Sequence, residues 1–137
     1  MEHIPTILPI IKRNAFMTSI DLQDAYFSLP IVKRHRKYLR FIWRNTLYEF
    51  QCLCFGLSLA PFYFTKAMKP IFSQLRREGI HCTHYIDDSL YINSSEKQLE
   101  KDTARAKDLL QSLGFTINLG KSSFQPSKTN YTPRVCY

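Results

Sequence analysis

Two β-prone runs meet at an acidic pair in the segment Ile80-His81-Cys82-Thr83-His84-Tyr85-Ile86-Asp87-Asp88-Ser89-Leu90-Tyr91-Ile92-Asn93. Residues 80–85 and 89–93 are rich in β-branched and aromatic side chains, so we expect them to pair as a tight hairpin with Asp87 and Asp88 at its tip. Adjacent carboxylates repel each other unless a proton or a cation neutralises them. Taken alone, however, an Asp-Asp pair more often marks a plain turn.

A third acid, Asp21, stands where another strand is expected to end. Residues 16–20 form an apolar run typical of a strand, and residues 22–27 are expected to be a turn or short helix that ends before Pro30. Carboxylate oxygens are hard ligands, which favour Mg²⁺ or Mn²⁺. If Asp21 folds against Asp87 and Asp88, the acids form a divalent metal site.

Aromatic residues fill a second expected hairpin, made of residues 38–43 and 47–52 and joined by Arg44, Asn45 and Thr46. A run of cations precedes and enters this hairpin: Lys33, Arg34, Arg36, Lys37 and Arg40. Such cations suit the phosphates of a template strand. We favour the plainer interpretation, in which the cations form the solvated face of the hairpin and the aromatic residues its buried face.

Two amphipathic helices are expected around the acidic hairpin. The first follows a loop at residues 55–61, begins at Pro61 and ends near Gly79, and Pro70 predicts a kink or a stop and restart within it. The second follows Ser95 and Gln98, which have the spacing of a capping box. Their apolar stripes are Phe64, Ala67, Met68, Ile71, Phe72 and Leu75 in the first, and Leu99, Thr103, Ala106, Leu110 and Leu113 in the second.

A last strand is expected over residues 115–119, just before Lys121. The order strand, hairpin, helix, hairpin, helix, strand predicts an α+β fold with helices packed on one face of an antiparallel sheet. No linker or internal repeat divides the chain, so one compact unit is the simplest arrangement.

Composition narrows the choice of partner. The 137 residues carry 19 Lys and Arg against 11 Asp and Glu, and the net charge of +8 makes nucleic acid the first partner to consider, although a soluble basic surface also explains it. No apolar run approaches the ~20 residues of a membrane span. The cysteines lack disulfide spacing, and His81, Cys82 and His84 alternate along one strand and cannot converge on zinc. We therefore expect an intracellular protein, with nucleus and cytoplasm not distinguished.

Four separated motifs resemble those of reverse transcriptases in residues, order and spacing. They are Ser19-Ile20-Asp21-Leu22-Gln23-Asp24-Ala25-Tyr26-Phe27-Ser28-Leu29-Pro30-Ile31, Phe55-Gly56-Leu57-Ser58-Leu59-Ala60-Pro61-Phe62-Tyr63-Phe64, Tyr85-Ile86-Asp87-Asp88, and the stretch from Gly114-Phe115 through Lys121-Ser122. The resemblance covers about residues 4–125. Within the family, Lys37-Tyr38-Leu39-Arg40-Phe41-Ile42-Trp43 followed by Leu47-Tyr48-Glu49-Phe50 is most similar to retrotransposons of the LTR-type (gypsy-like) and DIRS-like groups, of which we favour the DIRS-like group. It identifies residues 1–125 as a polymerase palm and residues 126–137 as a divergent tail.

The resemblance implies RNA-directed DNA polymerase activity, in which deoxynucleoside triphosphates extend a primer 3′-hydroxyl on an RNA or DNA template with two Mg²⁺ ions, or Mn²⁺. Asp21 and Asp87 would hold the ions and Asp88 would support them by charge. Lys121 would protonate the leaving pyrophosphate, although a lone lysine there is also explained as a solvated charge. Nucleotide contacts are implied for Leu22, Asp24, Ala25, Tyr26, Phe55 and Gly56, and primer or template contacts for Tyr85, Pro61 and Arg40.

Tyr26 would lie beneath the incoming sugar and exclude a 2′-hydroxyl, and its plainer role is that of a core aromatic. Phe55 stands where retroviral enzymes usually have a polar residue, which leaves one nucleotide contact unassigned.

Reverse transcriptases also use fingers, a thumb and an RNase H domain, which we expect to lie outside this chain. Residues 129–137 depart from the Leu-Gly-containing strand expected next, as a truncated or out-of-frame tail would. Positioning supplies much of an enzyme's rate. One alternative is therefore a non-catalytic relic that keeps a nucleic-acid-binding palm, and another is a metal-free structural domain.

Overall fold

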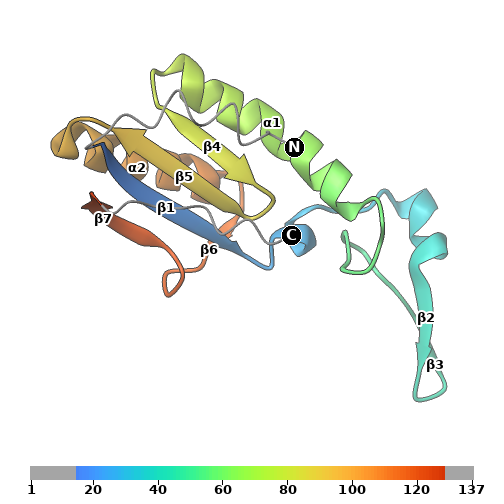
Figure 1. Ribbon diagram of the computed structural model, residues 1–137. Helices are drawn as coiled ribbons and strands as arrows, with labels where there is room; N and C mark the ends of the chain where they lie inside the picture. The colour runs from blue at the N-terminus through green and yellow to red at the C-terminus, as the bar shows by residue number, and fades with distance from the viewer. Residues whose placement is uncertain (1–14, 129–137) are drawn as a thin grey trace.

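The structure, a computed structural model, describes residues 15–128. An antiparallel five-stranded sheet lies at its centre (Figure 1). The strands are β1 (Phe16–Gln23), β4 (Cys82–Tyr85), β5 (Asp88–Asn93), β6 (Thr116–Ile117) and β7 (Ser123–Ser127). Their order is β4-β5-β1-β6, and β7 also pairs with β1. The middle strand β1 therefore has β5 along one edge and β6 and β7 along the other.

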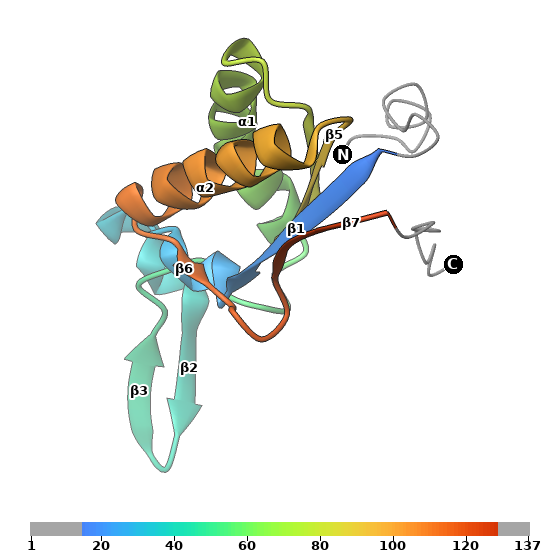
Figure 2. The ribbon, with the colours of Figure 1, turned by 90° about the vertical axis from the view of Figure 1, so that its left-hand side faces the viewer.

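Helices cover one face of this sheet, as expected (Figure 2). Ile20 and Leu22 of β1 belong to the main core, and Thr18 Oγ1 lies 2.6 Å from Thr103 Oγ1 of helix α2 (Glu96–Ser112). Because side chains alternate along a strand, Met17 and Asp21 point to the opposite face. That face carries a smaller cluster of Ala15, Met17 and Ile92.

Helix α1 (Ala60–Arg77) has Pro61 in its first turn, where no amide donor is needed, and Gly79 follows its end with a φ of +85°. Its buried stripe of Phe64, Met68, Phe72 and Leu75 confirms the predicted periodicity, whereas Ala67 is exposed. The helix does not stop at Pro70. Pro70 and Lys66 are both exposed, so water can bond the Lys66 carbonyl that the proline leaves without a helical donor.

Helix α2 begins at the predicted cap, because Ser95 Oγ accepts a hydrogen bond from the Gln98 amide at 3.4 Å. The reciprocal half of the capping box is missing: the Gln98 side chain donates to Asp102 at 2.9 Å. Leu99, Thr103, Ala106 and Leu110 are buried as predicted. The inclusion of Leu113 in that stripe is wrong, since Leu113 follows the helix end and is 53% exposed.

A separate two-stranded sheet extends away from the rest of the protein (Figure 1). It consists of β2 (Arg40–Trp43) and β3 (Thr46–Glu49), joined by Arg44 and Asn45, which both have positive φ as a two-residue hairpin turn requires. The predicted hairpin is thus confirmed with shorter strands. The predicted buried face is wrong, because every residue of both strands is exposed.

Two 3₁₀ helices precede this hairpin. The helix η2 (Ala25–Ser28) confirms the short helix expected before Pro30, and η3 (Lys33–Leu39) carries most of the basic run that we placed on the hairpin. Tyr38 therefore lies in η3 and not in a strand.

The C-terminal part differs most from expectation. The strand predicted over residues 115–119 is reduced to β6, and β7 was not predicted. Strand β7 crosses the expected boundary between residues 125 and 126, and residues 129–137 lie outside the described range. Within residues 15–128, no helix combines the length and apolar character that a membrane span needs.

Candidate metal centre

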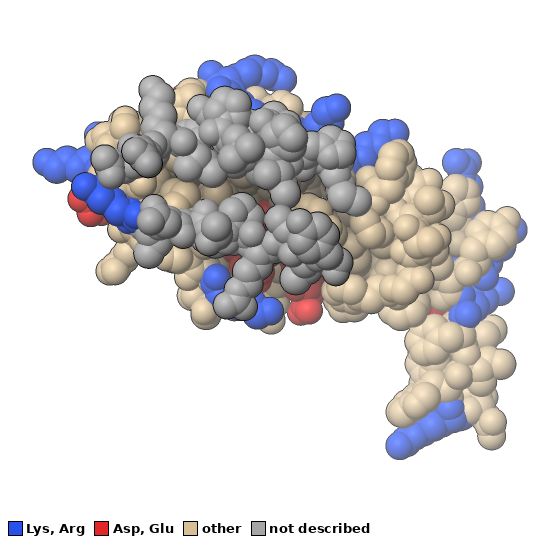
Figure 3. Space-filling view, in the orientation of Figure 1, with Lys and Arg blue, Asp and Glu red and all other residues tan. Residues whose placement is uncertain are grey.

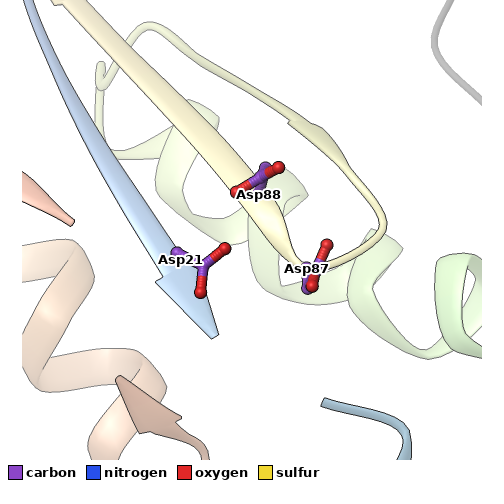
Figure 4. A group of neighbouring side chains, drawn as sticks. All are labelled: Asp21, Asp87 and Asp88. Carbon is purple, nitrogen blue, oxygen red and sulfur yellow. The ribbon is translucent and has the colours of Figure 1, made fainter. Parts of the chain in front are cut away.

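Three carboxylates converge on the face of the sheet that the helices leave open. One oxygen from each of Asp21, Asp87 and Asp88 lies within 4.8 Å of the others (Figure 4). Asp21 pairs directly with Asp88 across β1 and β5, and Asp87 belongs to the turn between β4 and β5. We had expected Asp21 at the end of its strand. It lies inside β1, because the strand continues to Gln23.

The backbone explains why Asp21 and Asp88 are close. The Asp21 N–H and C=O both bond toward the far edge of β1, to Ser122 Oγ at 2.9 Å and from the Asn118 amide at 2.8 Å. Asp21 and Asp88 therefore form a non-hydrogen-bonded antiparallel pair, the type in which facing side chains lie nearest each other.

The turn that carries Asp87 is held in an unusual conformation. Ile86 has a φ of +53°, a region that a β-branched residue rarely adopts and that costs about 1–3 kcal/mol. The Asp87 carbonyl accepts a hydrogen bond from the Leu22 amide at 2.9 Å, which fixes the turn to β1. The surrounding sheet thus imposes this geometry on Ile86 and Asp87.

The electrostatics of the cluster favour a cation. Partial burial, a hydrogen bond with Asp21 and the charges of Asp87 and Asp21 together raise the pKa of Asp88 to about 6. Lys121 opposes this shift and so lies within electrostatic range of Asp88. Oxygen-only donors with mutual repulsion suit Mg²⁺ or Mn²⁺, so the residues present fit a divalent metal site.

Tyr26 lies between the core and the acids. It is 8% exposed, and its ring contacts Phe55 at 4.9 Å and Phe64 at 5.5 Å. Burial and then the negative charge of Asp87 raise its pKa, which places the phenol near the carboxylates. Tyr26 therefore packs in the core, as the plainer expectation held, and lies within electrostatic range of Asp87.

The other residues expected to contact the nucleotide or nucleic acid differ in exposure. Leu22 and Ala25 are buried in the core, whereas Asp24 is exposed and precedes η2 with a φ of +49°. Phe55 is 64% exposed and leads into Gly56, whose φ of +88° favours glycine. Pro61 lies in the first turn of α1, and Tyr85 is exposed at the end of β4 beside the acidic turn.

Arg40 is not brought to this cluster. It begins β2 on the extending hairpin and forms an ion pair with Glu49, with Nε 3.1 Å from Oε2. Its expected template contact therefore concerns the hairpin and not the metal centre.

Sequence reasoning gave no role to Ser122 or Ser89. Ser122 Oγ accepts from the Asp21 amide, and Ser89 Oγ donates to the Ile20 carbonyl at 3.1 Å, so hydroxyl groups hold β1 from both edges next to Asp21. Ser122 stood within the fourth motif, but its spacing from Asp21 carried no signal because the two are 101 residues apart.

Known proteins resemble this chain over most of its length. The family model described as "Reverse transcriptase (RNA-dependent DNA polymerase)" matches residues 3–132. The Tf2-3 and Tf2-7 transposon polyproteins of Schizosaccharomyces pombe are 28% and 27% identical to the chain over 131 residues, which cover 93% of it. The chain spans 10% of the length of each relative.

Solved structures share the fold. The prototype foamy virus protease-reverse transcriptase matches 90% of this chain, and 16% of its own, with a TM-score of 0.77 and 22% identity. A foamy viral protease-reverse transcriptase in complex with an RNA/DNA hybrid has a TM-score of 0.76 and 23% identity over 89% of this chain and 16% of that one. The family model matches nearly the whole chain, and the fold is shared with solved reverse transcriptases. The chain therefore belongs to the reverse transcriptase (RNA-dependent DNA polymerase) family.

Proposed function

We propose that this chain is the catalytic palm of an RNA-directed DNA polymerase, which transfers deoxynucleotides to a primer 3′-hydroxyl. The observation that carries the proposal is the convergence of Asp21, Asp87 and Asp88 on the open face of the sheet. An acidic cluster needs a cation or a proton at neutral pH. The family to which the chain belongs is that of RNA-dependent DNA polymerases, and two divalent ions held by carboxylates suit such phosphoryl transfer.

Asp21 and Asp87 would hold two Mg²⁺ ions, or Mn²⁺, with Asp88 adding charge. When bound, such ions would supply the charge that activates the primer hydroxyl and stabilises the leaving pyrophosphate. Tyr26 would present its ring beside the nucleotide sugar, since it lies next to Phe55 and within range of Asp87. Lys121 would supply a proton to pyrophosphate, and its nearness to Asp88 supports that role.

A primed RNA or DNA template is the expected partner. Foamy viral relatives have been solved with an RNA/DNA hybrid and with double-stranded DNA, and a net charge of +8 favours polyanions. On the described part of the face shown in Figure 3, Lys and Arg are visible around the margin and at the hairpin tip.

The decisive test is nucleotide incorporation on a primed RNA with Mg²⁺, using the wild-type chain, Asp87→Asn and Asp108→Asn. Asp108 is an exposed acid on α2 and serves as a matched control. We expect extension by wild type and Asp108→Asn, and a fall of at least about a hundredfold for Asp87→Asn. Extension retained by Asp87→Asn would refute the metal assignment.

A second candidate function is a nucleic-acid-binding palm without catalysis. The chain spans only 10% of the curated relatives' length, and much of a polymerase's rate comes from how other domains position the substrates. This candidate predicts that a labelled primer-template binds the chain, with affinity that falls steeply as salt rises, but is not extended. If Mg²⁺ also fails to raise the melting temperature, a metal-free structural domain is the remaining alternative.

A further inference from the structure

The edge of β1 opposite β5 is interrupted at Asp21. Strand β6 pairs with Leu22 and Gln23, while β7 pairs with Met17 and Ser19, so Asp21 falls between the two partner strands. The register also shifts between Met17 and Ser19, which marks an irregular pairing. A residue at such a gap loses the ladder partners that satisfy backbone groups elsewhere in the sheet.

The turn formed by residues 118–122 fills this gap. The Asn118 amide donates to the Asp21 carbonyl at 2.8 Å, and the Asp21 amide donates to Ser122 Oγ at 2.9 Å. Ser122 Oγ in turn donates to the Asn118 carbonyl at 2.7 Å. One hydroxyl therefore accepts from the strand and donates to the turn, and both backbone groups of Asp21 are satisfied.

The same turn carries Lys121. The Lys121 amide donates to Asn118 Oδ1 at 3.3 Å, and the Lys121 charge acts on Asp88. Asn118 and Ser122 thus link the backbone of one proposed metal ligand to the placement of a proposed proton donor. Both hydrogen bonds end on residues of this one five-residue turn, so a change in the turn would alter the backbone of Asp21 and the position of Lys121 together.

We propose that Ser122 is a positioning residue, whose hydroxyl fixes the backbone of Asp21 so that its carboxylate meets those of Asp87 and Asp88. The inference rests on the proposed metal site. The backbone of Asp21 is the point from which its short side chain reaches the cluster, so freedom there becomes freedom of the carboxylate. Groups that orient metal ligands in this way typically change metal affinity 10- to 100-fold when removed, and we expect about tenfold.

The neighbouring Ser123 provides a matched control. Ser122 is half-buried and bonds Asp21 through its side chain, whereas Ser123 is exposed and pairs with Ser19 in the β7 ladder. Ser122→Ala and Ser123→Ala therefore make the same chemical change, the loss of a serine hydroxyl, at adjacent residues with different partners. Ser122→Thr retains a hydroxyl and tests rescue, and Ser122→Cys keeps the side-chain size if the alanine variant does not fold.

Two measurements on the full chain test the proposal without using polymerase activity. The first is the hydrogen-exchange rate of the Asp21 amide in the metal-free protein, followed by NMR. The second is Mn²⁺ binding, followed by electron paramagnetic resonance. In Ser122→Ala we expect the Asp21 amide to exchange about tenfold faster and Mn²⁺ to bind about tenfold more weakly. Ser123→Ala should match wild type in both measurements, and Ser122→Thr should recover most of the loss.

The outcomes separate this inference from the proposed function. Unchanged exchange at Asp21 in Ser122→Ala would overturn the role of the hydroxyl. Faster exchange with unchanged Mn²⁺ affinity would also overturn the inference, because the bond would then only complete the sheet edge. A wild-type chain that takes up no Mn²⁺ would instead overturn the metal site of the proposed function, and the positioning role with it.

Discussion

The five-stranded sheet and the β2–β3 hairpin are both antiparallel and rich in β-branched and aromatic residues, yet they differ in what covers them. The sheet is backed by α1 and α2, and its main core includes Ile20, Phe64 and Leu110 at 0% exposure. The hairpin projects from the body, and Ile42 and Trp43 are 74% and 55% exposed (Figure 1). The rings of Phe41 and Tyr48 stack on each other at 5.6 Å, but no second layer lies over them within the described residues.

The difference separates two kinds of information in the sequence. Alternation and turn residues specify which strands pair, and both hairpins form where those patterns lie. Burial depends on a second layer, which only the larger sheet has here. An isolated two-stranded hairpin is marginally stable in water, so we expect the acidic cluster to belong to the stable unit and the hairpin to be loosely coupled to it.

The largest expected difference between the two regions is the loss of stability when a phenylalanine is replaced by alanine. Phe64→Ala removes a ring at 0% exposure that contacts Tyr26 and Phe115, and should lower the free energy of unfolding by about 3–5 kcal/mol. Phe41→Ala removes a ring at 43% exposure that contacts Tyr48 and Phe50, and should cost less than about 1 kcal/mol. Urea unfolding followed by circular dichroism measures both.

A loss for Phe41→Ala comparable to that for Phe64→Ala would show that the hairpin is part of the cooperative core. The hairpin and the five-stranded sheet would then form one stable unit. If Phe64→Ala leaves too little folded protein to measure, Phe64→Leu gives a smaller loss in the same direction, because it keeps much of the buried volume.

The acidic hairpin could be predicted because its signals are local. Two β-prone runs flank Asp87 and Asp88, which predicts a tight hairpin there. Asp87 lies in the two-residue turn as expected, whereas Asp88 is the first residue of β5 and pairs with Tyr85, so it is not at the tip. Which acid would face them was not readable from periodicity, since strand pairing between β1 and β5 joins residues about 70 apart in sequence. The family motifs, and not the pattern, indicated Asp21.

The edge of the sheet was less predictable. Strand β7 contains Pro126, which lacks an amide donor and is tolerated only where a strand edge is free. Its residues are neither apolar nor alternating, so nothing local marks them as a strand. The 3₁₀ helix η3 was missed for a related reason. None of its residues is buried, so its sequence has no apolar periodicity that would mark a helix.

A second, smaller contrast concerns pH. Asp88 has a pKa raised to about 6 from an ordinary 3.8, so the fold favours its protonated form. Stability from this group is fully present below about pH 4 and is lost as pH rises through 6, by on the order of 1 kcal/mol after allowance for solvent screening. We expect the difference in melting temperature between Asp88→Asn and wild type, without metal, to grow over this range.

Mg²⁺ should compensate for that loss. Its stabilising effect on the wild-type chain should be larger at pH 7 than at pH 4.5, where protonation already relieves the repulsion. Glu49→Gln provides the control in the hairpin, because the exposed Arg40–Glu49 ion pair is worth at most about 1 kcal/mol and lies outside the cluster. A Mg²⁺ effect that is equal at both pH values would contradict the origin assigned to the raised pKa of Asp88.

The smallest expected effect tests the loose coupling of the hairpin directly. Asn45 has a φ of +59° in the β2–β3 turn, so Asn45→Gly should stabilise the hairpin by a few tenths of a kcal/mol and Asn45→Ala should destabilise it by about 1 kcal/mol. Hydrogen exchange of the β2 and β3 amides should slow in the first variant and quicken in the second. The urea midpoint should stay the same in both, because opening the hairpin exposes little that the core had buried. If the midpoint instead moves with the exchange rates, the hairpin and the metal-bearing sheet unfold as one unit, and the exposed aromatic residues contribute to the stability of the site.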